Sequence, residues 1–229
     1  MQLAAFSVAF NGKEGIFLQN GRNELQYWND IYKASRRGEP EGNDNWLDKH
    51  SKLLERSKDK AILDLGCGSG WDTMYLTDRG YKVIACDLSE EALHNVAEAV
   101  PAVQTRQLNL LEPLPFPTDS ASVIVADLSL HYFTWSQTLS ILAELQRVLE
   151  PGGALLCRVN STKDTAYGAG QGRVIEPNLY ECDGRLKRFF DRDQLHRLLA
   201  GWSILWMQET VMHRYDKPKH CWELAAAVG

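Results

Sequence analysis

The sequence predicts an α/β fold in which helices cover both faces of a mostly parallel sheet. Between residues 61 and 160, five short apolar runs alternate with segments of helical character. Each apolar run ends at an Asp or an Asn, and the first leads directly into a glycine-rich turn. Strands that alternate with helices pair in parallel through right-handed crossovers. We therefore expect a ligand site where their carboxyl ends meet.

Composition and charge narrow the class of protein. The 229 residues suffice for one α/β domain with a full core, and the net charge of -5 gives no footprint for binding duplex nucleic acid. The five cysteines are widely spaced and include no CxxC pair, so we expect reduced thiols, no metal site and a cytoplasmic location. The first ten residues predict neither a signal peptide nor a membrane anchor.

The first elements predict a helical cap. Residues 1–20 show no clear pattern, whereas 22–34 place apolar residues on one face at helical spacing. This helix either packs on the core or forms a lid that closes over a ligand. Its aromatic density favours a lid built from Tyr27, Trp28 and Tyr32.

The remaining elements are expected in the following order. A polar loop at 36–45 precedes a second helix at 46–57. Strands are predicted at 61–65, 82–86, 103–108, 122–126 and 154–159, with intervening helices at 70–79, 90–99 and 135–149. Ser89 is the expected N-cap of the helix at 90–99. Prolines within 113–117 exclude a central strand there. The helix at 135–149 is expected to direct one row of leucines to one side: Leu139, Leu142, Leu145 and Leu149.

After residue 160 the pattern weakens. Residues 160–190 form a long polar and glycine-rich connection, of a kind that is usually functional or mobile. A helix at 191–200 and strands at 202–211 and 221–228 are expected to complete the fold, with Trp202, Trp206 and Trp222 in its core. We expect one domain over 1–229, comprising a cap at 1–58, a ligand-binding core at 59–160 and a substrate side at 161–229.

The strand exits and the glycine turn supply the candidate site. The polar residues at the five exits are Asp64, Asp87, Asn109, Asp127 and Asn160. In the turn, glycine recurs at every second position, so the backbone can adopt positive φ and present free N–H groups at a helix start. The spacing Gly66-x-Gly68-x-Gly70 differs from the GxGxxG fingerprint of dinucleotide-binding folds. An NAD-binding or nucleotide-sugar-binding protein is therefore the less favoured alternative.

These motifs resemble those of the class I S-adenosylmethionine-dependent methyltransferases. The matching segments are Leu63–Gly70, Asp87, Leu114–Phe116, Asp127 and Arg147–Gly153. The resemblance covers about 60–160 and implies a Rossmann-like sheet of seven strands with an antiparallel last strand, here under an N-terminal helical lid. Short segments at 187–190 and 214–220 are also similar to small bacterial tellurite-resistance and thiol-type methyltransferases.

The resemblance implies S-adenosyl-L-methionine as cofactor and S-adenosyl-L-homocysteine as product. Residues implied to hold the methionine part are Asp64, Gly66, Cys67, Gly68 and Gly70. Residues implied to hold the adenosine part are Asp87, Leu88, Asn109 and Leu110, of which the carboxylate of Asp87 would accept hydrogen bonds from the ribose hydroxyls. Asp127 is implied to line the methyl-donor end, and Tyr27 and Trp28 would close the site.

Candidates near the transferred methyl group are Asp127, His131, Tyr132 and Asn160. His131 could act as a general base, or it could be a structural histidine before the next helix. Asp164 and Tyr167 could bind substrate or simply hold their loop.

The sequence favours a small-molecule methyl acceptor, handled by a monomer or a homodimer without a membrane partner. The Asn/Asp-Pro-Pro-Tyr signature of enzymes that methylate amino groups is absent after Asp127. Four arginines could pair with an anionic acceptor or could form salt bridges: Arg158, Arg173, Arg188 and Arg214. The alternatives are an RNA or protein acceptor, or a catalytically silent cofactor-binding module.

Overall fold

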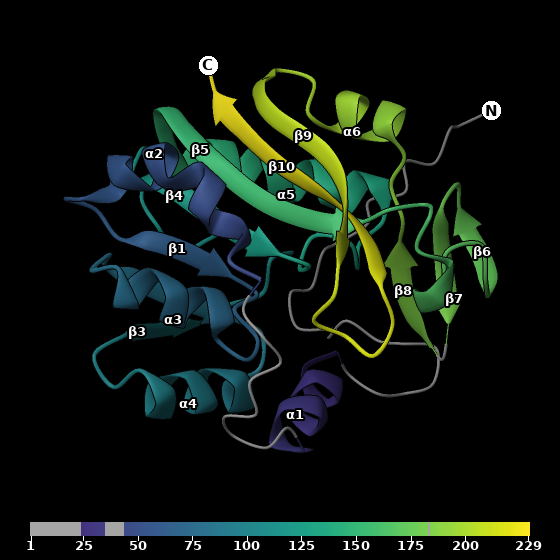
Figure 1. Ribbon diagram of the computed structural model, residues 1–229, viewed down its shortest axis with the longest axis horizontal. Coiled ribbons are helices and arrows are strands. Elements are labelled where there is room, and N and C mark those ends of the chain that lie inside the picture. Colours follow the sequence, from purple (N-terminus) through teal and green to yellow (C-terminus); the bar gives the residue numbers. More distant parts are fainter. Residues whose placement is uncertain (1–23, 35–43, 183) are drawn as a thin grey trace, which may run out of the picture.

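The computed structural model describes residues 24–34, 44–182 and 184–229 (Figure 1). The expectations for residues 1–20, and for all but the end of the loop at 36–45, lie outside the described residues. The N-terminal helix lies within them and spans Glu24–Ala34 (α1), close to its predicted range.

A seven-stranded sheet forms the centre of the molecule, with strand order β3-β2-β1-β4-β5-β10-β9. The strands are β1 (Ile62–Leu65), β2 (Val83–Asp87), β3 (Gln104–Gln107), β4 (Ala121–Asp127), β5 (Leu149–Asn160), β9 (Trp202–Met212) and β10 (Lys219–Val228). β1 to β5 pair in parallel, whereas β10 is antiparallel to both β5 and β9. The predicted mostly parallel sheet is confirmed, and the strand order reverses between β1 and β4, where such sheets bind ligands.

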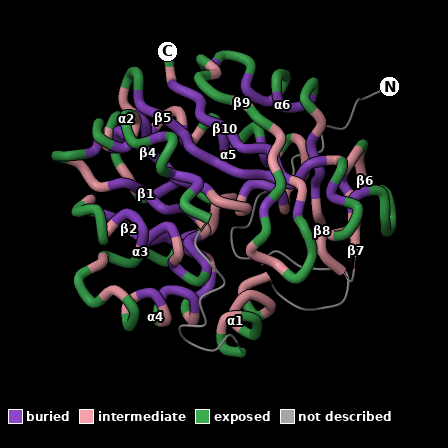
Figure 2. Tube along the Cα trace, viewed as in Figure 1, coloured by how far each residue is buried: buried purple, intermediate pink, exposed green. Residues whose placement is uncertain are grey.

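Helices cover both faces, because residues of the buried strands alternate between two cores. The helices of the sheet are α3 (Trp71–Asp78), α4 (Glu90–Ala99), α5 (Trp135–Val148) and α6 (Arg192–Leu198). Leu63 and Ile124 belong to the core under α5 and α6, whereas Ile62 and Val125 belong to the core under α3. The buried tube of Figure 2 follows these strands through the middle of the fold.

Local signals place the helix starts as predicted. The Ser89 side chain accepts the Ala92 N–H and caps α4, and Thr134 forms a capping box with Gln137 at the start of α5. The predicted helix at 46–57 is instead broken into η1 (Trp46–His50), α2 (Ser51–Leu54) and η2 (Glu55–Ser57).

One prediction of burial is wrong, and the predicted row of leucines is only partly buried. Leu142, Leu145 and Leu149 are buried, whereas Leu139 is 42% exposed, because the buried face of α5 runs through Ile141, Leu142 and Leu145. Trp206 is 40% exposed on β9, which is an edge strand, whereas Trp202 and Trp222 are buried as predicted.

The long connection at 160–190 contains a second sheet that the sequence pattern did not reveal. It comprises β6 (Arg173–Glu176), β7 (Leu179–Cys182) and β8 (Arg185–Arg188), paired antiparallel. Each strand has only four residues and several charges, so the alternation typical of a half-buried strand is too short to detect. This sheet stands beside the main sheet, at the right of Figure 1, and α1 lies below the main sheet in the same view.

Three further features concern the cysteines, membrane-spanning helices and metal-binding side chains. All five cysteines are free thiols, and all but Cys182 are buried. Within the described ranges, no helix is long and apolar enough to cross a membrane. The same residues include no cluster of three or more His, Cys, Asp or Glu side chains that could hold a metal ion.

Candidate functional site

A cavity of about 620 Å³ opens at the carboxyl ends of β1, β2 and β4. This volume falls within the range of small-molecule sites in proteins. The cavity has three walls: the strand ends with their following turns, helix α1, and the three-stranded sheet β6–β8. The cavity therefore lies where the strand order reverses, and helix α1 and the sheet β6–β8 add walls to it.

The glycine turn after β1 has the backbone geometry that the sequence predicts. Gly66, Gly68 and Gly70 adopt φ values of 73°, 50° and 80°, which side-chain-bearing residues rarely adopt. The space for a Cβ atom is filled by the protein itself. The Tyr32 hydroxyl lies 2.6 Å from the Cβ position at Gly68, and Ser129 lies against that at Gly66. These glycines therefore permit close packing of α1 and the β4 exit, besides exposing N–H groups to a ligand.

Asp87, at the end of β2, is buried and lines the cavity. One carboxylate oxygen accepts the Ser89 N–H and the other accepts the Gly68 N–H, each at 2.9 Å. Burial raises the pKa of Asp87, although these bonds to backbone N–H groups oppose that rise. Each oxygen retains acceptor capacity, so the carboxylate suits a ligand that presents two adjacent hydroxyl groups.

Asp64, at the end of β1, is almost fully buried at the cavity floor. Its Oδ2 accepts a hydrogen bond of 2.5 Å from the Thr73 hydroxyl. Burial raises the pKa of Asp64 to about 7, and the hydrogen bond from Thr73 opposes part of this rise. A cationic ligand group beside Asp64 would favour its charged form.

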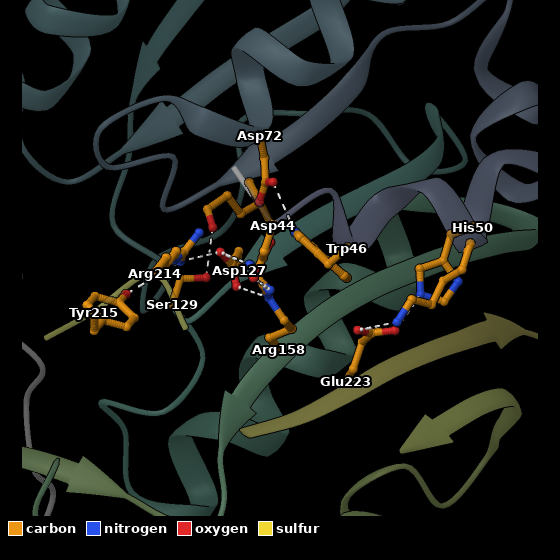
Figure 3. Close-up of polar contacts among 12 residues, drawn as sticks. Asp44, Trp46, His50, Asp72, Asp127, Ser129, Arg158, Arg214, Tyr215 and Glu223 are labelled. Atoms are coloured by element: carbon orange, nitrogen blue, oxygen red, sulfur yellow. Dashed lines mark hydrogen bonds and ion pairs between the residues drawn. The ribbon is translucent and has the colours of Figure 1, made fainter. Parts of the chain in front are cut away.

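Asp127, at the end of β4, is the centre of an ionic cluster (Figure 3). Arg158 donates to its two oxygens at 2.7 and 2.8 Å, Arg214 donates at 2.7 Å, and Arg158 also pairs with Asp44 at 2.5 Å. Although burial opposes ionisation, the charges of Arg158 and Arg214 lower the pKa of Asp127 to about 2. Asp127 is therefore a fixed anion that orients two arginines and is not available to accept a proton near neutral pH.

Most of the predicted site residues line one cavity. They are Trp28, Asp64, Gly66, Cys67, Gly68, Asp87, Leu88, Asn109, Leu110, Asp127 and Tyr132. Four predicted residues are not among the lining residues: Tyr27, Gly70, His131 and Asn160. The Asn109 side chain also accepts the Leu111 N–H at 3.0 Å, so one lone pair of its oxygen is already used in a local turn.

His131 and Asn160 lie behind the cavity wall, which corrects their placement beside the transferred group. The His131 ring is buried 4.3 Å from the Tyr132 ring, and burial lowers its pKa well below the usual value. The Asn160 amide donates to the Arg188 carbonyl at 3.4 Å, and Asn160 is fully buried. This arrangement favours the structural interpretation of His131 over the general-base interpretation.

Asp164 and Tyr167 hold their loop, one of the two roles that the sequence left open. The Asp164 carboxylate accepts from Lys219 Nζ at 2.9 Å and from the His220 N–H at 3.1 Å. The Tyr167 hydroxyl donates to the Lys217 carbonyl at 3.0 Å. Neither residue lines the cavity.

Helix α1 is attached at both sides of the cavity. Asn95 of α4 donates to the Tyr32 carbonyl at 3.0 Å, and the Arg185 guanidinium stacks 4.0 Å from the Tyr27 ring. Tyr27 therefore fixes the helix to the first residue of β8, whereas Trp28 and Tyr32 face the cavity. Whether α1 opens as a lid stays a prediction.

Several lining residues were not predicted as part of the site. They are Glu24, Ser129, Phe133, Ile175, Glu181, Leu186 and Tyr215. Most come from α1, from the second sheet or from the β9–β10 hairpin, which approach the cavity only through the fold. Of the four arginines singled out by the sequence, Arg173 and Arg214 line the cavity, whereas Arg158 and Arg188 are buried in ion pairs.

The sheet order, the glycine turn and the acids that follow β1 and β2 define a Rossmann-like domain of the class I methyltransferase type. A family model described as a methyltransferase domain matches residues 62–153, the segment that contains these features. Over this segment the chain is similar to the class I S-adenosylmethionine-dependent methyltransferases.

Similar proteins extend the comparison. The chain is 36% identical over 155 residues to the methyltransferase YodH of Bacillus subtilis, covering 65% of this chain and 61% of YodH. It is 27% identical over 166 residues to the tRNA N(3)-cytidine methyltransferase METTL2 of Gallus gallus, covering 67% of this chain and 45% of METTL2. The chain spans about half the length of other curated relatives that it matches.

A solved structure shares the fold. The Burkholderia thailandensis 1,6-didemethyltoxoflavin-N1-methyltransferase, with 1,6-didemethyltoxoflavin and S-adenosylhomocysteine bound, has a TM-score of 0.61 and 22% identity. The alignment covers 89% of this chain and 83% of that one.

Proposed function

We propose that this protein transfers a methyl group from S-adenosyl-L-methionine to a small-molecule acceptor. The observation that carries the proposal is one continuous cavity. It runs from Asp87 past Asp64 to Asp127, and on between α1 and the sheet β6–β8. When bound, the cofactor supplies a sulfonium methyl group for in-line displacement. The chain itself would bind, orient and shield the reactants.

The donor set of the cavity fits this cofactor. The Asp87 carboxylate retains acceptor capacity for the two ribose hydroxyls, and Leu88 and Leu110 offer apolar surface for the adenine. The buried Asp64 carboxylate beside the glycine turn suits the ammonium group of the methionine part. The two carboxylates lie at the ends of the paired strands β1 and β2, as the two halves of one ligand require.

The far half of the cavity supports a small acceptor. Its walls carry Trp28, Tyr132, Tyr215 and Leu186, which offer an apolar and aromatic surface. The sequence as a whole is acidic, with a net charge of -5, which disfavours a long RNA acceptor. The resemblance to a tRNA methyltransferase makes RNA the alternative to be tested.

Ligand-induced stabilisation tests the cofactor. At one hundred times its Kd, S-adenosylmethionine should stabilise the fold by about 2.7 kcal/mol and raise Tm by roughly 5–10 °C. S-adenosylhomocysteine should act similarly and NAD should not, as measured by differential scanning fluorimetry. Stabilisation by NAD alone would contradict the proposal. Stabilisation without release of S-adenosylhomocysteine in the presence of acceptor compounds or RNA would indicate a silent binding module.

Substitution of Asp87 tests the ribose contact. Asp87→Ala should weaken cofactor binding by about 1–3 kcal/mol, because charge-assisted hydrogen bonds are lost. Isothermal titration calorimetry measures the change. Asp78→Ala is the matched control, since Asp78 is exposed at the end of α3 and does not line the cavity. Equal affinities in the two variants would refute the assignment.

A further inference from the structure

We propose that the methyl acceptor is a carboxylate oxygen of a small organic acid, held by the guanidinium group of Arg214. This inference rests on the proposed methyltransferase function and adds the class of substrate and the residue that selects it. Three observations carry it: the position of Arg214, the ionic cluster that fixes Arg214, and the side chains around it. These side chains line the far half of the cavity, between α1 and the sheet β6–β8, which we call the chamber.

Arg214 reaches the cavity from the hairpin between β9 and β10. One of its nitrogens, Nη2, donates to Asp127 at 2.7 Å and to the Tyr215 hydroxyl at 3.5 Å (Figure 3). Within the described part of the chain, its Nε and Nη1 groups have no hydrogen-bond partner. Its side chain is 13% exposed while it lines the cavity. The Nε–H and Nη1–H donors lie on different edges of the planar guanidinium, so a carboxylate in the cavity can accept a charge-assisted hydrogen bond from the edge that faces it.

The fold places this fork near the reacting end of the cofactor. In S-adenosylmethionine the sulfur joins the ribose to the methionine chain, so Asp87 and Asp64 bracket the position of the sulfonium. In the sheet, Asp64 lies beside Val125 of β4, two residues before Asp127. Arg214 is bonded to Asp127 and is therefore next to the space into which the methyl group points.

The other arginine of the cavity is less suited to this role. The Arg173 side chain is 57% exposed, and Arg173 pairs with Glu181 across the β6–β7 ladder. No lysine or histidine is among the described residues that line the cavity. Arg214 is thus the more buried of the two arginines that an anionic acceptor would meet inside the chamber.

Several carboxyl groups line the cavity, but those near Arg214 already have partners. Asp127 is held between two arginines, Asp72 accepts the Trp46 indole N–H at 3.0 Å, and His131 lies behind Tyr132. A hydroxyl or ammonium acceptor would need a base, whereas a carboxylic acid is already ionised near neutral pH. An oxygen lone pair of the acceptor forms the new O–CH₃ bond, the C–S bond breaks, and its electron pair stays on sulfur. The products are a neutral methyl ester and the thioether, and no proton is transferred.

One lining group defines the competing possibility. Glu24 of α1 lines the chamber, and burial raises its pKa while the Arg185 charge opposes the rise. Glu24 could serve as a base for an amine acceptor. The apolar and aromatic walls suit an acid with an apolar body, so the two possibilities predict different acceptors of similar shape.

The decisive experiment offers matched acceptors to the full chain with S-adenosylmethionine. The panel contains phenylacetate, octanoate, and the corresponding amines, thiols, alcohols and phosphate monoesters. S-adenosylhomocysteine release and product mass are measured. Methyl esters of the acids are expected. Methylation of another class while the carboxylates stay unmodified would overturn the inference without affecting the proposed function. If the chain does not bind S-adenosylmethionine, both the inference and the proposed function are overturned.

Two variants test the role of Arg214. Arg214→Gln should reduce kcat/KM for the carboxylate by about 100-fold, corresponding to a lost charge-assisted contact of about 2–3 kcal/mol. Cofactor Kd should stay within about twofold, and Arg214→Lys should recover part of the activity. Arg197→Gln, on the exposed side of α6, is the control. Full activity of Arg214→Gln, or amine methylation that Glu24→Gln abolishes, would contradict the assignment. If Arg214→Gln fails to fold, the acceptor panel and Arg214→Lys still decide the question.

Discussion

Arg158→Met is expected to lower the free energy of unfolding by about 3–5 kcal/mol, since it leaves a buried carboxylate without its main partner. Arg158 is 1% exposed near the carboxyl end of β5 and donates to both oxygens of Asp127. Its other contacts are the Asp44 carboxylate and the Trp46 ring, whose centroid lies 4.6 Å from the guanidinium. The substitution therefore also detaches the segment that precedes η1 from the sheet.

Urea-induced unfolding measures this loss, and two further variants separate its causes. Asp127→Asn combined with Arg158→Met removes both charges and should be less destabilised than Arg158→Met alone. Arg197→Met, an exposed arginine on α6 whose guanidinium lies 5.6 Å from the Trp135 ring centroid, should change stability by at most about 1 kcal/mol. An Arg158→Met protein as stable as the Arg197→Met control would show that the ionic cluster does not stabilise the fold.

The ionic cluster also predicts how stability depends on acid. The pKa of Asp127 is lowered from its ordinary value near 3.8 to about 2 in the folded state, because the charges of Arg158 and Arg214 outweigh the effect of burial. The folded protein therefore binds fewer protons than the unfolded chain between these values. The contribution of Asp127 is present above about pH 4 and is lost as the pH falls towards 2. The double variant should lack this component of acid unfolding.

The cofactor half of the site was predictable from the sequence because its signals are local. Buried parallel strands such as β1 and β4 are visible in the sequence as short apolar runs, and each is marked by an acid at its end. The sheet topology then places these acids at one edge. The glycine spacing from Gly66 to Gly70 predicts directly that the backbone adopts positive φ at these positions. The sequence also offered a salt bridge as one interpretation of Arg158, although it did not identify Asp127 as the partner.

The acceptor half was less predictable because it is assembled from distant segments. Arg214 meets Asp127 across 87 positions of sequence, only because β10 folds back antiparallel to β5 and brings the hairpin over the β4 exit. The strands β6–β8 are too short and too charged to show a period. His131 illustrates a third limit. A histidine two residues from Ser129, which lines the cavity, can itself point behind the wall, and no sequence pattern distinguishes the two directions.

Cofactor affinity is expected to fall steeply below pH 7, which is the second large effect. Asp64 is almost fully buried at the floor of the cavity, and burial raises its pKa to about 7. If its carboxylate holds the ammonium group of S-adenosylmethionine, only the ionised form binds well. The affinity should then fall by about tenfold for each pH unit below 7, and cofactor binding should release a proton.

The stability of the ligand-free protein should change in the opposite direction. The pKa of Asp64 is raised in the folded state, so folding favours its protonated form. Its contribution to stability is fully present below the unfolded value near 3.8 and is lost as the pH rises through about 7. The protein therefore carries a buried, partly unfavourable carboxylate at neutral pH, and a cationic ligand would relieve this cost.

Calorimetric titrations between pH 5 and pH 8 test this dependence and assign it to one carboxylate. S-adenosylhomocysteine carries the same ammonium group and should show the same slope. Methylthioadenosine lacks the amino-acid part and should bind with little dependence on pH, which separates Asp64 from the ribose contact at Asp87. Asp64→Asn should bind S-adenosylmethionine weakly at every pH. A wild-type affinity that is constant from pH 5 to pH 8 would mean that Asp64 does not bind the ammonium group, and a slope shared by methylthioadenosine would transfer the effect to Asp87.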